Sequence, residues 1–246
     1  MNVPQTLAKM TARSVVLSVL LGAHPAWATA AELLQLTSDF GIREQTLRVA
    51  LTRMVAAGDL VRSDDGYRLS DRLLNRQRRQ DDALYPRTRD WDGDWITLVI
   101  TAVGMDARAR AALRNTLQIK RFGELREGIW LRPGNLDDEL PAEVADRVRV
   151  LRARDDDPAE LTRRLWDLPA WASTGDRLLD EMAAARDVPG RFRAAAGAVR
   201  HLLTDPVLPK ELLPAHWPGA ELRKAYADFA AELGARRDEG RPVEAK

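Results

Sequence analysis

The stretch GIREQTLRVALTRMVAAGDLVRSDDGYRL, residues 41–69, decides the fold of the N-terminal region, because a helical pattern in it is followed directly by a hairpin pattern. Apolar residues recur in it at helical spacing, at Leu47, Leu51, Met54 and Val55. One face of a helix over residues 43–56 is therefore expected to be buried. Gly58 follows at the position where helices commonly end in a left-handed residue.

The second half of this stretch predicts a basic β-hairpin. Two short segments of alternating polarity, LVRS at 60–63 and YRLS at 67–70, flank Asp64-Asp65-Gly66, which has the composition of a tight turn. Because arginine binds phosphate oxygens, Arg62 and Arg68 in these segments are predicted to lie near a DNA backbone.

The face of the helix opposite its apolar stripe is interpreted as a surface that reads DNA. Its members are Gln45, Thr46, Arg48, Val49, Thr52 and Arg53. The side chains predicted to face base edges are Gln45, Arg48, Val49 and Thr52. Arg53 is predicted to lie nearer to phosphate. Any surface helix has a polar outer face, so the helix alone leaves that alternative open, whereas the array of helix, glycine stop and basic hairpin is more specific.

Two further helices are predicted before this stretch. The first covers about 12–21 and ends at Gly22, and the second follows Thr29, which forms a capping-box pattern with Glu32. Gly41 then permits a sharp turn. The order of helix, helix, turn, helix and hairpin is that of a winged helix-turn-helix, whose third helix enters the major groove.

A basic helix completes the predicted DNA-binding domain over residues 12–84. Its sequence, DRLLNRQRRQDDAL at 71–84, carries Arg76, Arg78 and Arg79 in the middle. It either lies along a phosphate backbone or is a solvated connector, and the connector is the simpler interpretation.

Charge is distributed unevenly along this chain of 246 residues, whose net charge is +1. Residues 43–80 hold nine arginines against five acidic residues, whereas the chain beyond residue 80 holds 27 basic and 30 acidic residues. A basic segment on a neutral to acidic body is typical of a module that binds a polyanion. Because 33 of the 38 basic residues are arginine, no single arginine has much weight by itself.

The residue types that carry most enzyme and metal chemistry are scarce. The absence of cysteine excludes disulfides, thiolate metal sites and cysteine nucleophiles. His24, His201 and His216 lie far apart, and no glycine-rich phosphate loop or nucleophile elbow occurs. The acidic run at 155–157 precedes a helix and suits helix capping. The sequence therefore predicts no catalytic residue, no metal, no cofactor and no enzyme.

The N-terminus imitates a secretory signal. Lys9 and Arg13 precede the apolar run SVVLSVLLGA, and Ala28-Thr29-Ala30 resembles a cleavage site. Cleavage would remove the first helix, against which the later helices must bury their apolar faces. We therefore expect this helix to be retained and the protein to be cytoplasmic, without contact to a membrane.

Beyond Trp91 the patterns change to a second and a third domain, which makes the fold class α+β and multi-domain. Apolar or alternating segments predict strands near 95–103, 127–132 and 148–153, with intervening helices at 106–123, 140–148 and 158–168. This alternation predicts a ferredoxin-like central domain over 91–168. Residues 169–234 are rich in alanine and leucine and predict a helical C-terminal domain.

Several blocks of the chain together resemble the family of phenylacetic acid catabolon repressors, the PaaX-like proteins. They are SVVLSVLLG, the helix and wing at 41–62, WDGDWITLVI, RARAALRNTLQIKRFGELREGIWLRP and DPVLPKELLPAHWPG. The resemblance implies a homodimeric bacterial repressor of aromatic-compound catabolic genes, with a winged-helix domain, a Cas2-like ferredoxin domain and a helical C-terminal domain. It further implies binding to double-stranded operator DNA and release by an aryl-coenzyme A effector such as phenylacetyl-CoA.

Candidate effector residues in the central domain are Arg110, Arg114, Arg121 and Trp130. The three arginines are suited to a phosphate-rich ligand. The alternative is that the arginines form only a solvated basic helix face and that Trp130 is a core residue.

Two other functions stay open. The winged helix could dock a protein within a ligand-binding or assembly module. The other is a metal-dependent nuclease with a Cas2-like fold, in which an acidic residue at the end of a strand would hold the metal. The first central strand has no aspartate near its end before Asp106, which makes this function improbable.

Overall fold

The structure is a computed structural model that describes residues 10–63 and 65–239. They form two compact units, each with its own core. The first unit takes in the chain up to Gln80 with Asp180–Gly197 and the residues from Lys224 onward, and the second takes in Asp81–Leu179 and Ala198–Arg223. The unit boundaries fall inside four helices.

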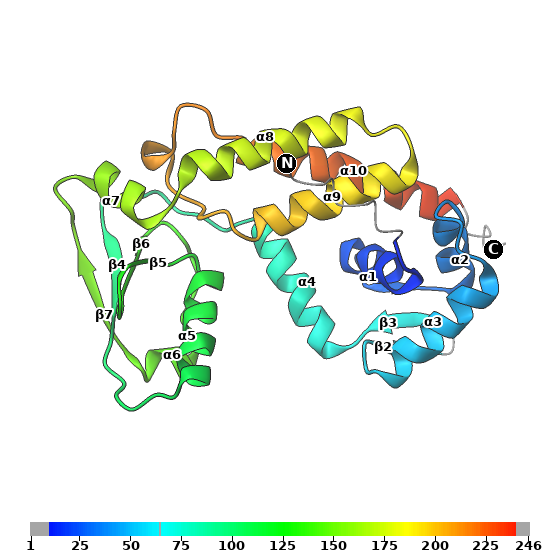
Figure 1. Cartoon of the computed structure of the whole chain (residues 1–246), viewed down its shortest axis with the longest axis horizontal. Helices are drawn as coiled ribbons and strands as arrows, with labels where there is room; N and C mark the ends of the chain where they lie inside the picture. Colours follow the sequence, from blue (N-terminus) through cyan, green and yellow to red (C-terminus); the bar gives the residue numbers. More distant parts are fainter. Residues whose placement is uncertain (1–9, 64, 240–246) are drawn as a thin grey trace, which may run out of the picture. The chain divides into compact units, whose positions relative to one another are not determined.

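The first unit begins with three helices and a small sheet. Its elements are α1 (Ala12–Gly22), β1 (Trp27–Ala28), α2 (Ala30–Ser38), α3 (Glu44–Ala56), β2 (Leu60–Arg62), β3 (Tyr67–Leu69) and α4 (Asp71–Leu84). The sheet is antiparallel with the order β1-β3-β2. Figure 1 labels its strands β2 and β3. The two-residue strand β1 has no counterpart in the sequence prediction, because it exists only through its pairing with β3.

The apolar stripe of α3 is buried in the core of this unit. Leu47, Leu51 and Met54 are almost fully buried, as the spacing predicted, and Val55 packs partly against the same core. The remaining core residues come mainly from α1 and α2, together with Phe192. The predicted glycine conformations are also present, since Gly41 has φ +65° and Gly58 has φ +68°.

The predicted capping box fixes the start of α2. The Thr29 hydroxyl accepts a hydrogen bond from the Glu32 amide at 3.1 Å, and the Glu32 carboxylate accepts one from the Thr29 amide at 2.7 Å. Burial raises the pKa of Glu32, but hydrogen bonds from Thr29 and from Arg237 outweigh it and lower the pKa overall. The capping carboxylate is therefore held in its charged form.

The helix predicted at 71–84 is present as α4. Its arginines Arg76, Arg78 and Arg79 are exposed, whereas Gln77 is buried and donates to the carbonyls of Leu21 and Ala23. Gln77 thus satisfies carbonyls at the C-terminal end of α1 that have no intrahelical partner.

The central sheet of the second unit has four strands, β4 (Trp95–Ile100), β5 (Gly123–Arg126), β6 (Ile129–Pro133) and β7 (Val148–Ala153). Its helices are α5 (Ala107–Ile119) and α6 (Ala142–Ala145). All pairs are antiparallel in the order β5-β6-β4-β7. This strand and helix order confirms the predicted ferredoxin-like domain.

The strand predicted near 127–132 is present as β6, but the strand β5 before it was not predicted. Residues 123–133 form a hairpin, β5 and β6, whose turn contains Gly128 with φ +81°. The helix predicted to continue to Gly123 ends at Ile119, and the strand predicted to reach Val103 ends at Ile100. Residues 123–127 contain few β-branched or aromatic side chains, so the local pattern did not reveal β5.

Each face of this sheet is buried against a different layer. Leu98, Trp130 and Val148 pack with Leu113 and Leu117 of α5. On the opposite face, the buried residues are Trp95, Leu131, Leu161, Leu168, Leu208 and Leu212. The sheet therefore lies between α5 with α6 and a layer made of α7 (Pro158–Leu165) and the chain around Leu208.

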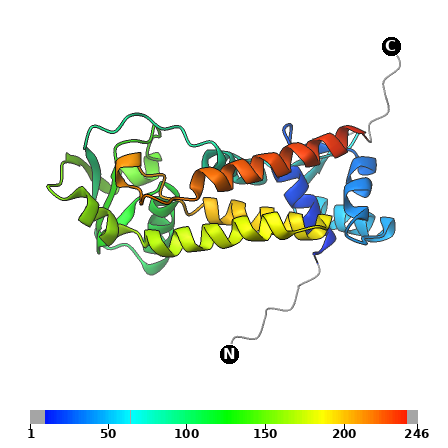
Figure 2. The same cartoon turned by 90° about the horizontal axis from the view of Figure 1, so that it is seen from above.

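The C-terminal part of the described chain contains α8 (Leu168–Ala184), α9 (Val188–Leu202), the short helix η1 (Lys210–Leu212) and α10 (Gly219–Glu239). Figure 2 shows α8 (yellow) and α10 (red) along their length. None of the described helices combines the length and the apolar character that a membrane span requires.

Candidate DNA-binding surface

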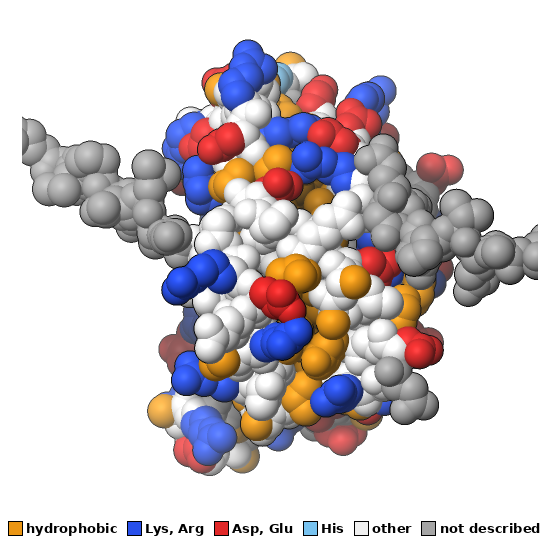
Figure 3. Space-filling view, turned by 90° about the vertical axis from the view of Figure 1, so that its right-hand side faces the viewer, with side chains coloured by type: hydrophobic (Ala, Val, Ile, Leu, Met, Phe, Trp, Pro, Cys, Tyr) orange, Lys and Arg blue, Asp and Glu red, His pale blue; other side chains and the backbone are white. Residues whose placement is uncertain are grey.

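The outer face of α3 is open to solvent. All six residues predicted there, Gln45, Thr46, Arg48, Val49, Thr52 and Arg53, are exposed. Val49 is 46% exposed although it is apolar, so it is available for contact with a base methyl group. Figure 3 looks onto the side where α2 and α3 lie in Figure 1 and shows basic side chains among acidic, hydrophobic and uncharged polar ones.

Part of this face borders an open groove of about 710 Å³ between α3 and the first turn of α1. The lining residues are Thr11, Ala12, Arg13, Gln45, Thr46, Val49, Ala50, Arg53, Met54, Ala57 and Asp59. The predicted residues therefore form two stripes, one along the groove with Val49 at its middle and one outside it with Arg48 and Thr52. The sequence did not predict that the first turn of α1 lines this groove. No pattern within that turn shows that it packs beside α3, which comes about 30 residues later in the chain.

Arg48 already has a partner on its own helix. Its guanidinium forms an ion pair with Glu44 at 2.5 Å, and both side chains are largely exposed. Thr52, one turn further on, donates to the Arg48 carbonyl at 3.0 Å. Exposed pairs of this spacing contribute only about 0.3–0.5 kcal/mol, so a stronger acceptor such as guanine can replace Glu44.

The hairpin beside α3 carries the two arginines predicted to lie near phosphate. Arg62 on β2 and Arg68 on β3 are both exposed. Arg68 pairs across the sheet with Trp27 and with Val61, so its backbone is held from both sides. Asp64, in the predicted turn, lies outside the described residues.

A buried carboxylate fastens the hairpin to the helices. Asp59 is 2% exposed and forms ion pairs with Arg13 of α1 at 2.8 Å and with Arg72 of α4 at 2.5 Å. Both arginines remain largely exposed at their side chains. Since two cations surround one carboxylate, the cluster leaves a net positive charge at the surface next to the groove.

The candidate effector residues occupy two separate places in the second unit. Arg114 forms an ion pair with Glu124 and lies over the ring of the buried Trp130, with 5.6 Å from its Cζ atom to the ring centroid. Arg110, one turn earlier on α5, is exposed and donates to the Met105 carbonyl at 2.6 Å. The indole nitrogen of Trp130 is buried and lacks a hydrogen-bond partner among the described residues.

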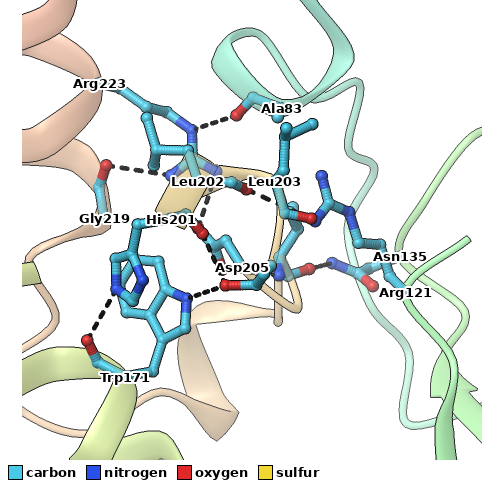
Figure 4. Close-up of polar contacts among 12 residues, drawn as sticks. Ala83, Arg121, Asn135, Trp171, His201, Leu202, Leu203, Asp205, Gly219 and Arg223 are labelled. Carbon is cyan, nitrogen blue, oxygen red and sulfur yellow. Dashed lines mark hydrogen bonds and ion pairs between the residues drawn. The ribbon is translucent and has the colours of Figure 1, made fainter. Parts of the chain in front are cut away.

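Arg121 lies apart from these residues and belongs to a network around the segment after α9 (Figure 4). It has φ +64° and donates to the Leu203 carbonyl at 2.5 Å. Burial lowers its pKa, and Asp205 acts in the opposite direction. Arg121 therefore has a structural role: its positive charge lies at the C-terminal end of α9, where the helix dipole favours a cation.

The network in Figure 4 holds the segment from Asp205 to Val207 in place. The buried Asp205 accepts hydrogen bonds from Arg223 at 2.7 Å and from the Val207 amide at 2.9 Å, and Asn135 donates to the Val207 carbonyl at 2.9 Å. Val207 has φ +53°, which a β-branched residue adopts only when its surroundings impose it.

No cluster of side chains suited to a metal ion occurs within residues 10–63 and 65–239. The described surface thus offers polar and basic groups for binding, grouped around α3 and the β2–β3 hairpin.

Family comparisons assign the whole arrangement to one class of protein. Residues 11–73 match the PaaX-like protein family, residues 88–162 match the PaaX protein central Cas2-like domain, and residues 171–239 match the PaaX-like protein C-terminal domain. The chain belongs to the PaaX-like family, as the resemblance of its sequence blocks predicted.

Two relatives extend this assignment. The chain is 29% identical over 222 residues to the transcriptional repressor PaaX of Escherichia coli (strain K12), with 78% of this chain and 70% of that protein covered. The solved structure of the uncharacterized protein Rv0674 from Mycobacterium tuberculosis is 69% identical in sequence and matches with a TM-score of 0.85. That match covers 94% of this chain and 98% of the other.

Proposed function

We propose that this protein is a DNA-binding transcriptional repressor of aromatic-compound catabolic genes, and not an enzyme. The observation that carries the proposal is the exposed polar face of α3 beside the arginine-bearing hairpin. Its relationship to the Escherichia coli repressor PaaX supports the same function.

In this proposal the N-terminal elements act as a winged helix-turn-helix. The third helix, α3, enters the major groove, and β2 with β3 forms the wing. Gln45, Arg48, Val49 and Thr52 contact base edges, while Arg53, Arg62 and Arg68 contact phosphate. Thr46 stands at the rim of the α3 groove and joins the same surface.

The proposal includes a homodimer, a small-molecule effector and three domains over 12–84, 91–168 and 169–234. An acyl-CoA such as phenylacetyl-CoA is the effector class, since it combines phosphates with an aromatic acyl group. Arg110, Arg114 and Trp130 are the candidate contacts on α5 and β6, and Arg121 is a separate candidate. Cytoplasmic localisation follows from this function.

Arg48→Ala tests the central contact. If Arg48 binds guanine through two hydrogen bonds, its loss should weaken operator binding by about 1–3 kcal/mol and relax sequence specificity. Fluorescence anisotropy with DNA from the promoter of the protein's own operon measures the affinity, and single base-pair variants of that DNA measure the specificity.

Arg163→Ala is a matched control for this variant. Arg163 is an exposed helical arginine paired with Glu160 at 2.8 Å, as Arg48 is paired with Glu44, but it lies on α7. It should bind the operator as tightly as the unmodified protein. Equal affinity for Arg48→Ala and Arg163→Ala would remove Arg48 from the set of base contacts.

Binding should also depend steeply on salt, because each neutralised phosphate releases bound cations. Arg62→Ala should reduce the slope of log affinity against log salt concentration by about one without changing base preference.

A protein-docking role for α3 predicts no gel shift at either of two salt concentrations, and a nuclease predicts cleavage of labelled DNA with magnesium or manganese.

A further inference from the structure

The short strand β1 touches both strands of the β2–β3 hairpin. Trp27 lies opposite Arg68 of β3, and its indole nitrogen donates to the hydroxyl of Ser63, directly after β2, at 3.2 Å. The backbone at Ala28 packs closely against the turn at Gly66. The position of β1 therefore sets the position of the hairpin and of the arginines on it.

Pairing with β3 alone does not fix β1. The strand has two residues, and the ladder continues past them only through the Leu69 amide, which donates to the Ala26 carbonyl at 3.1 Å. Because successive carbonyls of an antiparallel strand point to opposite sides, the next carbonyl, that of Trp27, faces away from β3. This carbonyl needs a partner from outside the sheet.

Arg237 of α10 is that partner. Its Nη2 donates to the Trp27 carbonyl at 2.7 Å, and its Nε donates to Oε1 of Glu32 at 3.2 Å. The other carboxylate oxygen of Glu32 accepts from the Thr29 amide in the capping box of α2. The side chains of Arg237 and Glu32 are only 12% and 4% exposed. One buried guanidinium thus joins the end of α10 to β1 and to the start of α2.

The neighbouring residue Arg236 reaches the other end of α2. It forms an ion pair at 3.3 Å with Asp39, the C-cap residue of that helix, and Figure 1 draws the end of α10 (red) beside α2 (blue). Both side chains of this pair are exposed, so it contributes little. The buried Arg237, whose planar fork binds two acceptors at once, is the contact that fixes the arrangement.

We propose that Arg237 is a positioning residue for DNA binding, because it holds β1 where the hairpin presents Arg62 and Arg68 to phosphate. The Arg237 guanidinium is occupied by Trp27 and Glu32 and does not bind DNA itself. The C-terminal end of α10 therefore belongs to the DNA-binding surface, although it lies far from the hairpin in the sequence. The inference rests on the proposed function for what the hairpin binds, whereas the contact between α10 and β1 is independent of it.

A double-mutant cycle on the full chain tests this role. Arg237→Ala should weaken binding to the promoter DNA about tenfold and lower the salt slope by about two, because both hairpin arginines leave their phosphates. Adding Arg62→Ala to this variant should change the affinity by less than about twofold, since the contact of Arg62 has already been lost. In the unmodified protein Arg62→Ala should have its full effect.

Arg191→Ala is the matched control. Arg191 also forms an ion pair with a glutamate of α10, Glu232, in the first unit, but it joins α9 to α10 instead of α10 to β1. Its loss should change the affinity by less than about twofold and leave the effect of Arg62→Ala intact. Thermal melts show whether each variant folds.

Arg237→Lys is the second variant, which keeps a cation beside Glu32 and therefore protects the fold. Lysine has no fork that reaches the Trp27 carbonyl at the same time. Operator binding should therefore fall about threefold or more in this variant, with the same loss of coupling to Arg62.

Hydrogen exchange measures the positioning without DNA. In the free protein, Arg237→Ala should speed exchange of the β3 amides, including that of Leu69, about tenfold relative to Arg191→Ala. The amides of α3 should keep their protection, because the apolar stripe of this helix remains buried. Equal exchange of β3 in the two variants overturns the inference.

The remaining outcomes are distinct. Unchanged affinity in folded Arg237→Ala and Arg237→Lys, with only a lower Tm, makes Arg237 merely structural and overturns the inference. Additive effects of Arg237→Ala and Arg62→Ala, with a salt slope lowered by about one, assign Arg237 itself to phosphate and also overturn it. If the unmodified protein binds no DNA, the repressor function fails, and faster exchange of β3 in Arg237→Ala still supports the hold of α10 on the hairpin.

Discussion

At the scale of single residues, the ring of Trp171 in the second unit is stacked on both faces. Its centroid lies 4.2 Å from that of His201 and 4.2 Å from that of Trp217, with interplanar angles of 22° and 15°. His201 Nε2 lies 2.9 Å from the Trp171 carbonyl, so the neutral ring donates from this nitrogen. Burial lowers the pKa of His201 below its usual value of 6.5, although the carbonyl of Trp171 acts in the opposite direction.

This pKa predicts how stability changes with pH. As pH falls below about 6.5, the unfolded chain takes up a proton at His201 that the folded chain resists, so the free energy of unfolding falls. His201→Gln keeps a donor for the Trp171 carbonyl but does not titrate. Thermal melts between about pH 7 and about pH 5 should therefore show a smaller drop in Tm for this variant. An equal drop would show that His201 does not contribute to the acid sensitivity.

At the scale of elements, the helices were largely predictable from the sequence, whereas the strands β1 and β5 were not. The helical spacing from Leu47 to Met54 and the capping pair Thr29 and Glu32 act within a few residues, so the sequence reveals them directly. Strand β1 has two residues and depends on its partner β3, and β5 depends on its neighbour β6 and on the approach of α7. Such pairing partners cannot be read from the strand's own sequence.

Gly66 supplies a prediction about the hairpin. A Cβ at this position would lie 2.4 Å from the Ala28 carbonyl oxygen and 3.1 Å from the Thr29 Cα, and these backbone atoms cannot move aside cheaply. Gly66→Ala should therefore destabilise the first unit by about 1–3 kcal/mol and weaken operator binding by displacing the wing. Chemical denaturation and anisotropy measure the two effects.

Gly234→Ala provides the contrast. Gly234 lies within α10, and nothing stands within 4 Å of a Cβ built on it. The alanine variant should be as stable as the original or more stable by up to about 1 kcal/mol. If Gly66→Ala is as stable as the original and binds DNA equally well, the close packing of the turn against β1 does not determine the position of the wing.

At the scale of the whole molecule, the proposed homodimer predicts the form of its operator. Two copies of α3 related by two-fold symmetry require a palindrome with half-sites about 10 bp apart or a multiple of that spacing. Footprinting on the promoter of the protein's own operon should reveal both half-sites. Protection of one unrepeated half-site would contradict a symmetric dimer on DNA.

The sequence by itself determined the helices of the N-terminal region, the glycine turns at 41 and 58, the alternation that marks the ferredoxin-like domain and the membership of the PaaX-like family. Those features depend on side-chain periodicity and backbone preference within short stretches. The exposure of the six residues on the outer face of α3 follows from the same helical periodicity, so it too was predictable from the sequence.

Only the tertiary structure decided which groups meet across long distances in the chain. It joined Asp59 to Arg13 and Arg72, placed the first turn of α1 beside α3, separated Arg121 from Arg114, and brought Arg237 to the Trp27 carbonyl. These arrangements depend on how packed elements share space and on which backbone groups remain unpaired, and no local pattern of residues encodes either one.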